Sequence, residues 1–556
     1  MGGSYGYTQL EWNPEVDPKA HPLWLVALTF IPKPWRPLSI TQFLSCMQAG
    51  SQMGAEKIPL PKSKGWDVRI RDGYYYLAHI ECKPEEVPER EKAYRKFMEP
   101  LIEDFEGVWD KWMAEEWLPV ANYFRERCHI DQLKELSDVE LLELLEDYET
   151  RCHRKVWVDY YVFLYASMDI YNQFADLCGD LIGIDTEHPL FKRLLGGFDT
   201  IEFRINKELW RLGDRAKELG LSQLFLTTKD NEELMAKLRD SDKGRKWLEE
   251  YSKFLYSNGY RCIGCFDCDT PTWLEKPSIV LRDIKAGMVK EGPFILDAER
   301  ERLIKEREEA EKEILAKVPR EQKGRFAKLM KGAEKTGWHK EEHAVLTSHL
   351  DTAIARHLFM EYGRRFAEYG VIDKQDDVFF LIFPEIRRAA ISQTNLRPYV
   401  DKRRKEWLNN LKVEVKQPFE GDISLLADIM WKNPIVRAWG GVPKVRPELE
   451  ADLYGASAVP GVAEGVARLI MSEDDLDEVQ PGEVLVAVNT NSLWTPVFGI
   501  LSAVVTDAGS SLAHAAIVAR EYGIPAVVGT QEATAKIKTG MRLRVDGDNG
   551  CVYILQ

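Results

Sequence analysis

The sequence predicts a multidomain α + α/β protein, in which a large, mostly helical region precedes a compact α/β domain. Three observations support this prediction. From Glu91 onward apolar residues recur at three- and four-residue spacing, which is typical of helices. A Pro- and Gly-rich segment follows at residues 433–450, and short Val-rich runs punctuated by glycine come after it. We therefore expect a helical region at 1–432, a linker at 433–450 and an α/β domain at 451–556.

Composition narrows the class of function. The 556 residues include 75 Lys and Arg against 90 Asp and Glu, and the net charge of −15 disfavours nucleic acids and membrane surfaces as partners. No stretch reads as a membrane span or as a secretory signal peptide. The nine cysteines are odd in number and mostly scattered, as is usual in a reducing cytoplasm. We expect a cytoplasmic protein with no nucleic-acid or membrane partner.

The spacing of apolar residues and the positions of turn residues predict the individual helices and strands. Alternating apolar residues around Asp72 and Gly73 predict a small hairpin within residues 68–80. The predicted helices are 93–127 with breaks at Pro100 and Pro119, 138–150, 151–178, 201–217, 231–238, 243–256, 297–317 and 338–369. The predicted strands of the C-terminal domain are 456–459, 466–470, 483–488, 503–506, 526–528, 542–545 and 552–555.

One predicted helix is dense in aromatic rings and is a candidate wall for an aromatic ligand. Trp157, Tyr161 and Tyr165 lie on it at spacings of four residues. Plain core packing would produce the same spacing, so both interpretations stay open. Arg261, in a Gly-, Asp- and Pro-rich stretch expected to be a loop, is a candidate anchor for a phosphate or carboxylate, and a surface ion pair is the alternative.

Two further groups of residues suggest chemistry only weakly. Cys262, Cys265 and Cys268 are evenly spaced, but a fourth cysteine ligand is not nearby, so we predict no metal and leave their role open. His339 and His343 fall on one helix face, and their order does not match the His-Glu-x-x-His zinc pattern. A general base for an acceptor hydroxyl is their candidate role, and structural histidines are the alternative.

The most informative stretch places a histidine at the start of a helix. Residues 503–506 read as a short buried strand, and residues 507–513 read as a turn of small residues. His514 then begins a helix that Gly523 and Pro525 end. The histidine is therefore presented where the first backbone N–H groups of a helix point outward.

That position suits a phosphoryl group bound to the imidazole, because helix N-termini favour anions. Gly509 and Ser510 leave room for the phosphoryl group to approach the backbone, and Thr506 and Ser511 offer hydroxyl donors. The same dipole should keep the ring neutral and nucleophilic at neutral pH. Taken alone, without the surrounding stretch, His514 would be interpreted as a histidine with its hydrogen bonds satisfied in a core.

The whole stretch resembles the phosphohistidine swivelling domain of the phosphoenolpyruvate-utilising enzymes. The family pattern is Thr-x-x-Gly-Gly-x-x-Ser-His, followed by Ala-Ala-Ile-Val-Ala-Arg-Glu and Gly-Ile-Pro-Ala-Val. The matching residues here include Thr506, Gly509, His514, Ala515, Arg520, Glu521, Gly523 and Pro525. Ser510 replaces the second glycine and Ala513 replaces the serine before the histidine. The resemblance implies that His514 carries the phosphoryl group, and we expect its phosphate ligands among Thr506, Gly509, Ser510, Ser511 and Arg520.

Residues 254–277 and 343–385 resemble the helical acceptor-substrate domain of rifampin phosphotransferase and the corresponding part of phenylphosphate synthase. In these families an ATP-grasp domain phosphorylates the histidine, and the swivelling domain carries the phosphoryl group to an acceptor. The chain shows no ATP-grasp pattern. The resemblance therefore implies a separate ATP-grasp-type subunit, which binds ATP and Mg²⁺, and a small acceptor with a phenolic or other alcohol hydroxyl.

Two other functions stay open at this stage. The chain could be a phosphorelay or regulatory protein whose phosphorylated His514 acts without turnover of an acceptor. It could also be a ligand-binding module whose histidine domain is vestigial, since Ser510 and Ala513 depart from the family pattern.

Overall fold

The computed structural model describes residues 11–26, 34–264, 266–289, 294–413, 415, 419–439, 449–491 and 494–555. The chain forms two compact units, each made of separate segments. The first consists of Met1–Ala166, Arg261–Thr272 and His343–Pro434, and the second of Ser167–Tyr260, Trp273–Glu342 and Ile435–Gln556. The predicted Pro/Gly linker stays a prediction, because residues 440–448 lie outside the described part of the chain.

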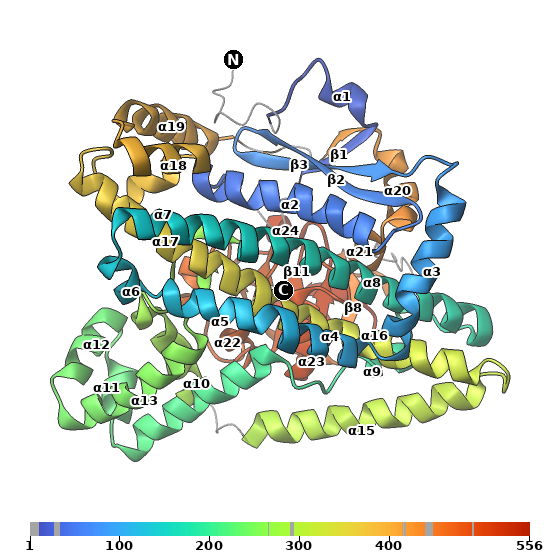
Figure 1. Ribbon diagram of the computed structural model, residues 1–556. Helices are drawn as coiled ribbons and strands as arrows, with labels where there is room; N and C mark the ends of the chain where they lie inside the picture. Colours follow the sequence, from blue (N-terminus) through green and yellow to red (C-terminus); the bar gives the residue numbers. More distant parts are fainter. Residues whose placement is uncertain are drawn as a thin grey trace. The chain divides into compact units, whose positions relative to one another are not determined.

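The first unit contains a four-stranded sheet in the order β2-β3-β1-β6. Its strands are β1 (Leu23–Val26), β2 (Ser63–Arg71), β3 (Tyr74–Glu81) and β6 (Phe419–Gly421). Strands β2 and β3 pair antiparallel around Asp72 and Gly73, whose φ angles of 55° and 78° suit a tight two-residue turn. The predicted hairpin is therefore confirmed, and Figure 1 shows its two blue arrows beside α2.

Helices make up most of the rest of the first unit. They are α1 (Asp17–Ala20), α2 (Pro37–Lys57), α3 (Val87–Glu103), α4 (Phe105–Trp112), α5 (Leu118–Arg127), α6 (Ile130–Glu135), α7 (Asp138–Tyr148), the first part of α8 (Arg154–Ile182), α17 (Leu350–Glu368), α18 (Phe383–Ser392), α19 (Arg397–Asn410) and α20 (Leu426–Lys432). The segment expected to be a loop around Arg261 contains a hairpin of β4 (Cys262–Gly264) and β5 (Asp267–Thr272).

The predicted helix over 338–369 is confirmed as helical through residue 368, and it contains a π-helical turn that was not predicted. The structure has two helices there, α16 (Lys323–His343) and α17, joined by a π-helical turn at Ala344–His349. Periodicity did not reveal the turn, because a π-turn adds only one residue to the helical repeat.

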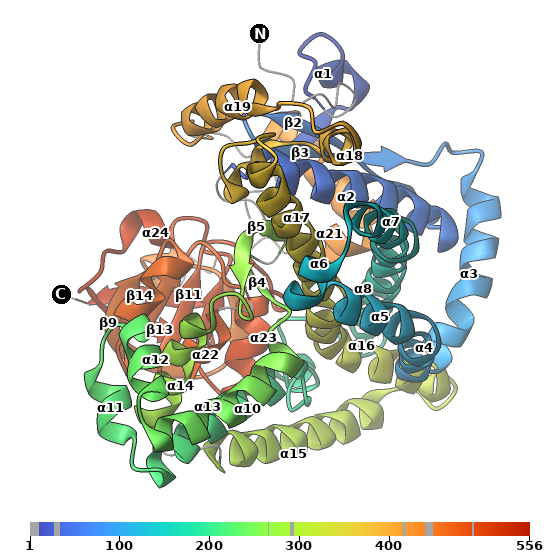
Figure 2. The same ribbon diagram turned by 60° about the vertical axis from the view of Figure 1, so that its left-hand side comes forward.

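The second unit combines helices with the C-terminal sheet. Its helices are the later part of α8, α9 (Pro189–Arg193), α10 (Ile201–Glu218), α11 (Ser222–Thr227), α12 (Asn231–Arg239), α13 (Asp242–Asn258), α14 (Leu281–Val289), α15 (Phe294–Lys317), nearly all of α16, α21 (Pro434–Trp439), α22 (Thr495–Phe498), α23 (His514–Glu521) and α24 (Ala533–Lys536). In Figure 2 the green helices α10 and α14 lie beside α22 and the red strands, in agreement with the contacts between these helices.

The C-terminal sheet has eight strands in the order β7-β14-β13-β9-β10-β11-β12-β8. They are β7 (Leu453–Tyr454), β8 (Ala456–Val459), β9 (Val462–Leu469), β10 (Val484–Ala487), β11 (Ala503–Thr506), β12 (Ala526–Val528), β13 (Arg542–Asp546) and β14 (Cys551–Leu555). The strands from β9 to β12 are parallel, and the remaining strands pair antiparallel on both sides of them.

This topology explains why the Val-rich runs are almost wholly apolar. Strands β10, β11 and β12 are buried along their full lengths, as is usual for parallel strands that are covered on both faces. All seven predicted strands of this domain are present within a few residues of their expected ends, and β7 is additional. No helix in the described ranges is long and apolar enough to cross a membrane.

Candidate functional site

A short loop connects the buried strand β11 to helix α23, and His514 is the first residue of that helix. The residue before it, Ala513, has an extended backbone (φ −68°, ψ 154°) and no side chain that caps the helix. The loop is held in place by Asp507, whose carboxylate accepts hydrogen bonds from the Thr530 hydroxyl and the Thr534 backbone N–H. The predicted strand, turn and helix start are therefore confirmed.

Both ring nitrogens of His514 have polar neighbours in the same unit. The Nδ1 atom lies 3.0 Å from Oε2 of Glu341 on α16, and Nε2 lies 3.2 Å from the hydroxyl of Thr495 on α22. The side chains of His514 and Glu341 are 11% and 5% exposed, so this contact is nearly dry. Since an ionised carboxylate can only accept a hydrogen bond, we assign the proton of a neutral His514 to Nδ1. The lone pair of Nε2 then faces Thr495.

The neighbouring residue on α16 also contacts the histidine loop. The ammonium group of Lys340 donates a 2.8 Å hydrogen bond to the carbonyl oxygen of Leu512. Lys340 and Glu341 thus bind the loop and its histidine from one turn of helix. Lys340 therefore holds the backbone of the loop, and the adjacent Glu341, of opposite charge, holds the imidazole of His514.

Among the predicted phosphate ligands, the hydroxyl-bearing residues are already engaged. The Thr506 hydroxyl donates to the carbonyl oxygen of Ala508, and the Ser510 hydroxyl donates to the carbonyl oxygen of Ala438. The Ser511 hydroxyl lies 3.4 Å from the Tyr171 hydroxyl. All three side chains are buried. In this arrangement they shape the loop, and their role as phosphate donors stays a prediction.

Arg520 is buried and binds backbone. Its guanidinium donates to the carbonyl oxygens of Ser511, at 2.9 Å, and Ala458, at 3.3 Å. Burial lowers the pKa of Arg520, and the charge of the adjacent Glu521 acts in the opposite direction. Burial also raises the pKa of Glu521 to about 7, although Arg520 opposes that rise. The described contacts therefore make Arg520 a support for the loop, and its predicted contact with phosphate remains to be tested.

Gly509 allows the tight path of the loop. Its φ angle is +123°, and a Cβ added there would come within 2.8 Å of the Ala513 Cβ. We expect Gly509→Ala to lower the free energy of unfolding by more than the roughly 1–3 kcal/mol typical of such backbone strain, as measured by denaturant unfolding. Gly540→Ala is the matched control, because Gly540 also has a positive φ (+95°) but no heavy atom within 4 Å of the added Cβ. If Gly509→Ala and Gly540→Ala lower the free energy of unfolding equally, the predicted clash between the added Cβ and Ala513 would be wrong.

The predicted acceptor-binding residues belong to the first unit. Trp157, Tyr161 and Tyr165 are 3%, 5% and 0% exposed, so their rings are part of a packed interior. The Trp157 ring packs against Phe43, and its N–H donates to the Asp351 carboxylate at 3.0 Å. Arg261 is also buried, which is inconsistent with a surface ion pair. Whether these residues bind an acceptor stays a prediction.

The two candidate bases are both buried. His343 lies in the first unit, where its ring stacks on Tyr160 and its Nε2 lies 3.2 Å from the Tyr160 carbonyl oxygen. That contact assigns the ring proton to Nε2 and leaves Nδ1 with the lone pair. His339 lies in the second unit and is 0% exposed. Their role as general bases stays a prediction.

The structure describes two of the three evenly spaced thiols, and their role stays open. Cys262 and Cys268 are buried, and Cys265 lies outside the described residues. Cys268 is close to the Ser39 hydroxyl and the Gln42 amide oxygen, at 3.4 Å and 3.5 Å. Among the residues the structure describes, no three His, Cys, Asp or Glu side chains are grouped so that they could hold a metal ion.

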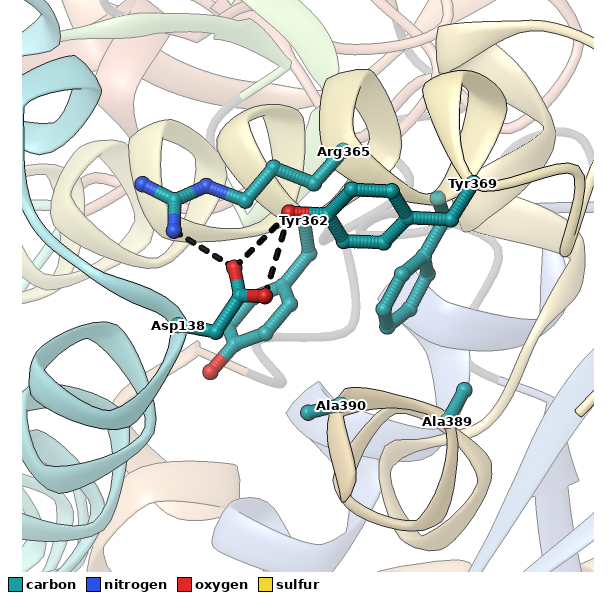
Figure 3. Close-up of a pocket in the computed structure, with 7 residues that line it drawn as sticks. Asp138, Tyr362, Arg365, Tyr369, Ala389 and Ala390 are labelled. Carbon is teal, nitrogen blue, oxygen red and sulfur yellow. Dashed lines mark hydrogen bonds and ion pairs between the residues drawn. The ribbon is translucent and has the colours of Figure 1, made fainter. Parts of the chain in front are cut away.

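A small hollow in the first unit was not expected from the sequence. Figure 3 shows the side chains that line it, including Asp138, Tyr362, Arg365 and Tyr369. Asp138 accepts hydrogen bonds from the Arg365 guanidinium and the Tyr369 hydroxyl, at 2.7 Å and 3.0 Å. Since its charges are paired within the protein, the hollow presents mainly aromatic and aliphatic surface.

Sequence reasoning also missed Glu341 and Thr495, the two partners of His514. No local pattern in the sequence indicated that the Thr495 hydroxyl would face the histidine. Glu341 lies 173 positions away from His514 in the chain, between the two histidines that attracted attention. Only tertiary packing brings it to the imidazole.

Two families match parts of the chain. Residues 479–550 match the mobile domain of PEP-utilising enzymes, and residues 162–341 match the fourth domain of rifampicin phosphotransferase. The first range contains His514 and Thr495, and the second contains Glu341 at its end. The resemblance to the PEP-utilising enzymes and to rifampicin phosphotransferase is thereby confirmed.

Curated relatives extend these matches. The chain is 28% identical to chondramide synthase cmdD of Chondromyces crocatus over 96% of its own length and 14% of that protein. It is 25% identical to the uncharacterized phosphotransferase YvkC of Bacillus subtilis (strain 168), over 97% of this chain and 62% of that one. It is also 25% identical to the rifampicin phosphotransferase of Streptomyces sviceus, over 60% of this chain and 37% of that one. The chain thus spans less than two thirds of each of these relatives.

Proposed function

We propose that this chain, with its PEP-utilising mobile domain and its match to rifampicin phosphotransferase, is the phosphohistidine-carrying part of an ATP-dependent phosphotransferase. The observation that carries the proposal is the arrangement around His514: Nδ1 faces the Glu341 carboxylate, and Nε2 faces a hydroxyl at the start of a helix. With the proton held on Nδ1 by Glu341, Nε2 is the nucleophilic nitrogen of the ring.

In the first half-reaction, Nε2 of His514 attacks a phosphoryl group in line with its leaving group. Glu341 holds the proton on Nδ1 and stabilises the positive charge that develops on the ring as the N–P bond forms. The N-terminal turn of α23 faces the charged oxygens of the phosphoryl group. Thr495 must turn its hydroxyl from Nε2 and can then donate to a phosphoryl oxygen.

In the second half-reaction, His514 is the leaving group, and an acceptor oxygen takes the phosphoryl group. We propose a small acceptor with a phenolic hydroxyl. This part of the proposal rests on the resemblance to phenylphosphate synthase, because Trp157, Tyr161 and Tyr165 lie in the packed interior of the first unit. His343 is the proposed general base, because its assigned tautomer places the lone pair on Nδ1.

The phosphoryl donor is proposed to be ATP, bound with Mg²⁺ by an ATP-grasp-type partner. Mg²⁺ would neutralise charge on the nucleotide phosphates during the transfer to His514. This part of the proposal rests on the resemblance to the phosphoenolpyruvate-utilising enzymes, and the partner would bind both cofactors.

The proposal is tested by intact mass spectrometry under non-acidic conditions. The chain is incubated with ATP, Mg²⁺ and a candidate ATP-grasp protein until it carries one phosphoryl group, and the nucleotide is then removed. Phenol is expected to discharge the adduct and to appear as phenyl phosphate. Cyclohexanol is the matched control, because it has a similar size but lacks an aromatic ring and an acidic hydroxyl, and we expect at least about tenfold slower discharge.

Each outcome leads to a different conclusion. Equal discharge by the two alcohols would replace the phenolic acceptor by a general alcohol acceptor. A stable adduct with every hydroxyl compound tested would favour a phosphorelay over an enzyme. If the ATP-grasp protein phosphorylates a histidine of another protein but leaves this chain without an adduct, the result would favour a ligand-binding module.

A further inference from the structure

A second group of polar side chains lies in the first unit, and its thiol, imidazole and carboxylate have no part in the phosphoryl transfer proposed for His514. The thiol sulfur of Cys46, on α2, lies 2.6 Å from Nε2 of His153. Nδ1 of the same imidazole lies 2.7 Å from Oδ2 of Asp351, on α17. The imidazole therefore contacts the thiol through one nitrogen and the carboxylate through the other. The same arrangement serves in cysteine enzymes, where the imidazole is the base that activates the thiol and the carboxylate orients the imidazole.

The carboxylate at the end of this line is held by two further donors. The Tyr148 hydroxyl donates to Oδ1 of Asp351 at 2.7 Å, and the Trp157 N–H donates to Oδ2 at 3.0 Å. With the His153 N–H, three donors surround one buried carboxylate. Burial disfavours the charged form of His153, yet Asp351 and Cys46 outweigh burial and raise the pKa of His153 well above its usual value. Burial raises the pKa of Cys46 and the neighbouring His153 opposes that rise, so the 2.6 Å contact between the sulfur and Nε2 is what favours transfer of the thiol proton to the imidazole.

We propose that Cys46 is a base-assisted modification site for small peroxides, activated by His153 and Asp351. The size of the reagent follows from burial. Cys46, His153 and Asp351 are 5%, 3% and 1% exposed, so burial excludes bulky reagents and the smallest peroxides are the reagents proposed for this sulfur. The π-helical turn Glu149–His153, in which His153 is the last residue, fixes the ring against α2.

The reaction balances with peroxide as the only co-reactant. The thiol proton passes to Nε2 of His153, and the sulfur attacks one peroxide oxygen as the O–O bond breaks. The departing hydroxide takes the proton from His153 and leaves as water. Cys46 becomes a sulfenic acid, oxidised by two electrons, while the peroxide is reduced by two electrons. His153 returns to its initial state.

Other thiols of the same unit provide internal controls. Cys268 is as buried as Cys46, at 2% exposed, but its described neighbours are the Ser39 hydroxyl and the Gln42 amide oxygen, at 3.4 Å and 3.5 Å. Burial raises the pKa of Cys268 as it raises the pKa of Cys46, but at Cys268 the Ser39 hydroxyl stands in place of an imidazole in opposing the rise. A hydroxyl and an amide oxygen do not accept the proton as an imidazole does, so Cys268 should react slowly.

The test measures sulfenic acid at each cysteine of the whole chain. The folded protein is treated briefly with hydrogen peroxide, the peroxide is removed with catalase, and the protein is unfolded in dimedone, which traps sulfenic acids. Peptide mass spectrometry then gives the oxidised fraction at Cys46 and Cys268. We expect Cys46 to oxidise at least about tenfold faster than Cys268, and His153→Gln to remove most of this difference. In protein unfolded before peroxide treatment, the two cysteines should react at similar rates.

A second variant covers the possibility that His153→Gln does not fold. Tyr148→Phe removes one donor to Asp351 and keeps the ring, and it should slow oxidation of Cys46 by a smaller factor than His153→Gln. Cys268→Ser should leave the rate at Cys46 unchanged. Equal rates at Cys46 and Cys268 in the folded protein would overturn the proposal. An unchanged Cys46 rate in folded His153→Gln, or in folded Tyr148→Phe where the first variant fails, would overturn the role of the imidazole and carboxylate.

Discussion

Replacement of His514 by asparagine is expected to abolish the phosphoryl adduct on this chain. Asparagine is close in size to histidine and can still hydrogen bond to Glu341, which lies 3.0 Å from Nδ1 in the native protein. An amide nitrogen, however, has no lone pair that is available for attack on phosphorus. The loss should therefore be complete within detection, whereas the loop and the helix remain intact. Intact mass spectrometry after incubation with ATP, Mg²⁺ and the ATP-grasp partner measures this.

The matched control is another histidine of the same unit. His188 precedes helix α9, and its Nδ1 accepts a hydrogen bond from the Leu190 backbone N–H at 3.2 Å. Asparagine is a favoured residue at such a helix start, so His188→Asn should keep both the fold and the phosphoryl adduct. An adduct that persists in His514→Asn would show that a different residue carries the phosphoryl group, with His339 the next residue to test.

Replacement of Glu341 by glutamine is expected to slow the charging of His514 by at least about tenfold without preventing it. Glutamine keeps the shape of the side chain but removes the negative charge that fixes the proton on Nδ1 and stabilises the ring cation. The variant should also carry a mixture of phosphohistidine isomers, because Nδ1 no longer has a fixed proton. Single-turnover charging gives the rate, and phosphorus NMR at alkaline pH distinguishes the two isomers.

Glu342 provides a close control for this change. It is also buried, but both of its carboxylate oxygens pair with the Arg204 guanidinium at 3.0 Å. Burial raises the pKa of Glu342 to about 7, although Arg204 opposes the shift, so the native side chain is partly protonated near neutral pH. Glu342→Gln should leave the charging rate and the isomer unchanged. Equal slowing in both variants would mean that packing of α16, and not the carboxylate on Nδ1, sets the rate.

The fold of the C-terminal domain could be predicted almost entirely from the sequence. Its parallel strands are runs of Val and Ala with glycine at their ends, and they read as strands because each run is buried on both faces. Strand β7 was not predicted, because its two residues, Leu453 and Tyr454, are too few to show the alternation of apolar and polar residues that indicates a strand. The helical region was harder, because π-helical turns such as Ala344–His349 keep the apolar pattern while they interrupt the α-helix.

The candidate site could be predicted only where it is local in the chain. His514 is recognisable because strand, small-residue turn and helix follow each other directly. Glu341 is not, because its closeness to the imidazole depends on packing between α16 and a loop 173 residues later in the chain. For the same reason the sequence could not distinguish between a ligand wall and a core at Trp157, whose Asp351 partner lies 194 residues away.

The order of strands in the C-terminal sheet has a mechanical consequence. Its first strand, β7, pairs with its last, β14, through Tyr454 and Cys551 and through Leu453 and Val552. The strands β14, β13, β9 and β10 separate β7 from β11, whose end leads into the His514 loop. A pull that enters the domain through residue 449 therefore loads the β7–β14 edge first. Four strands lie between that edge and the strand that leads to the imidazole, so we expect strain at the edge to leave the His514 turn unchanged.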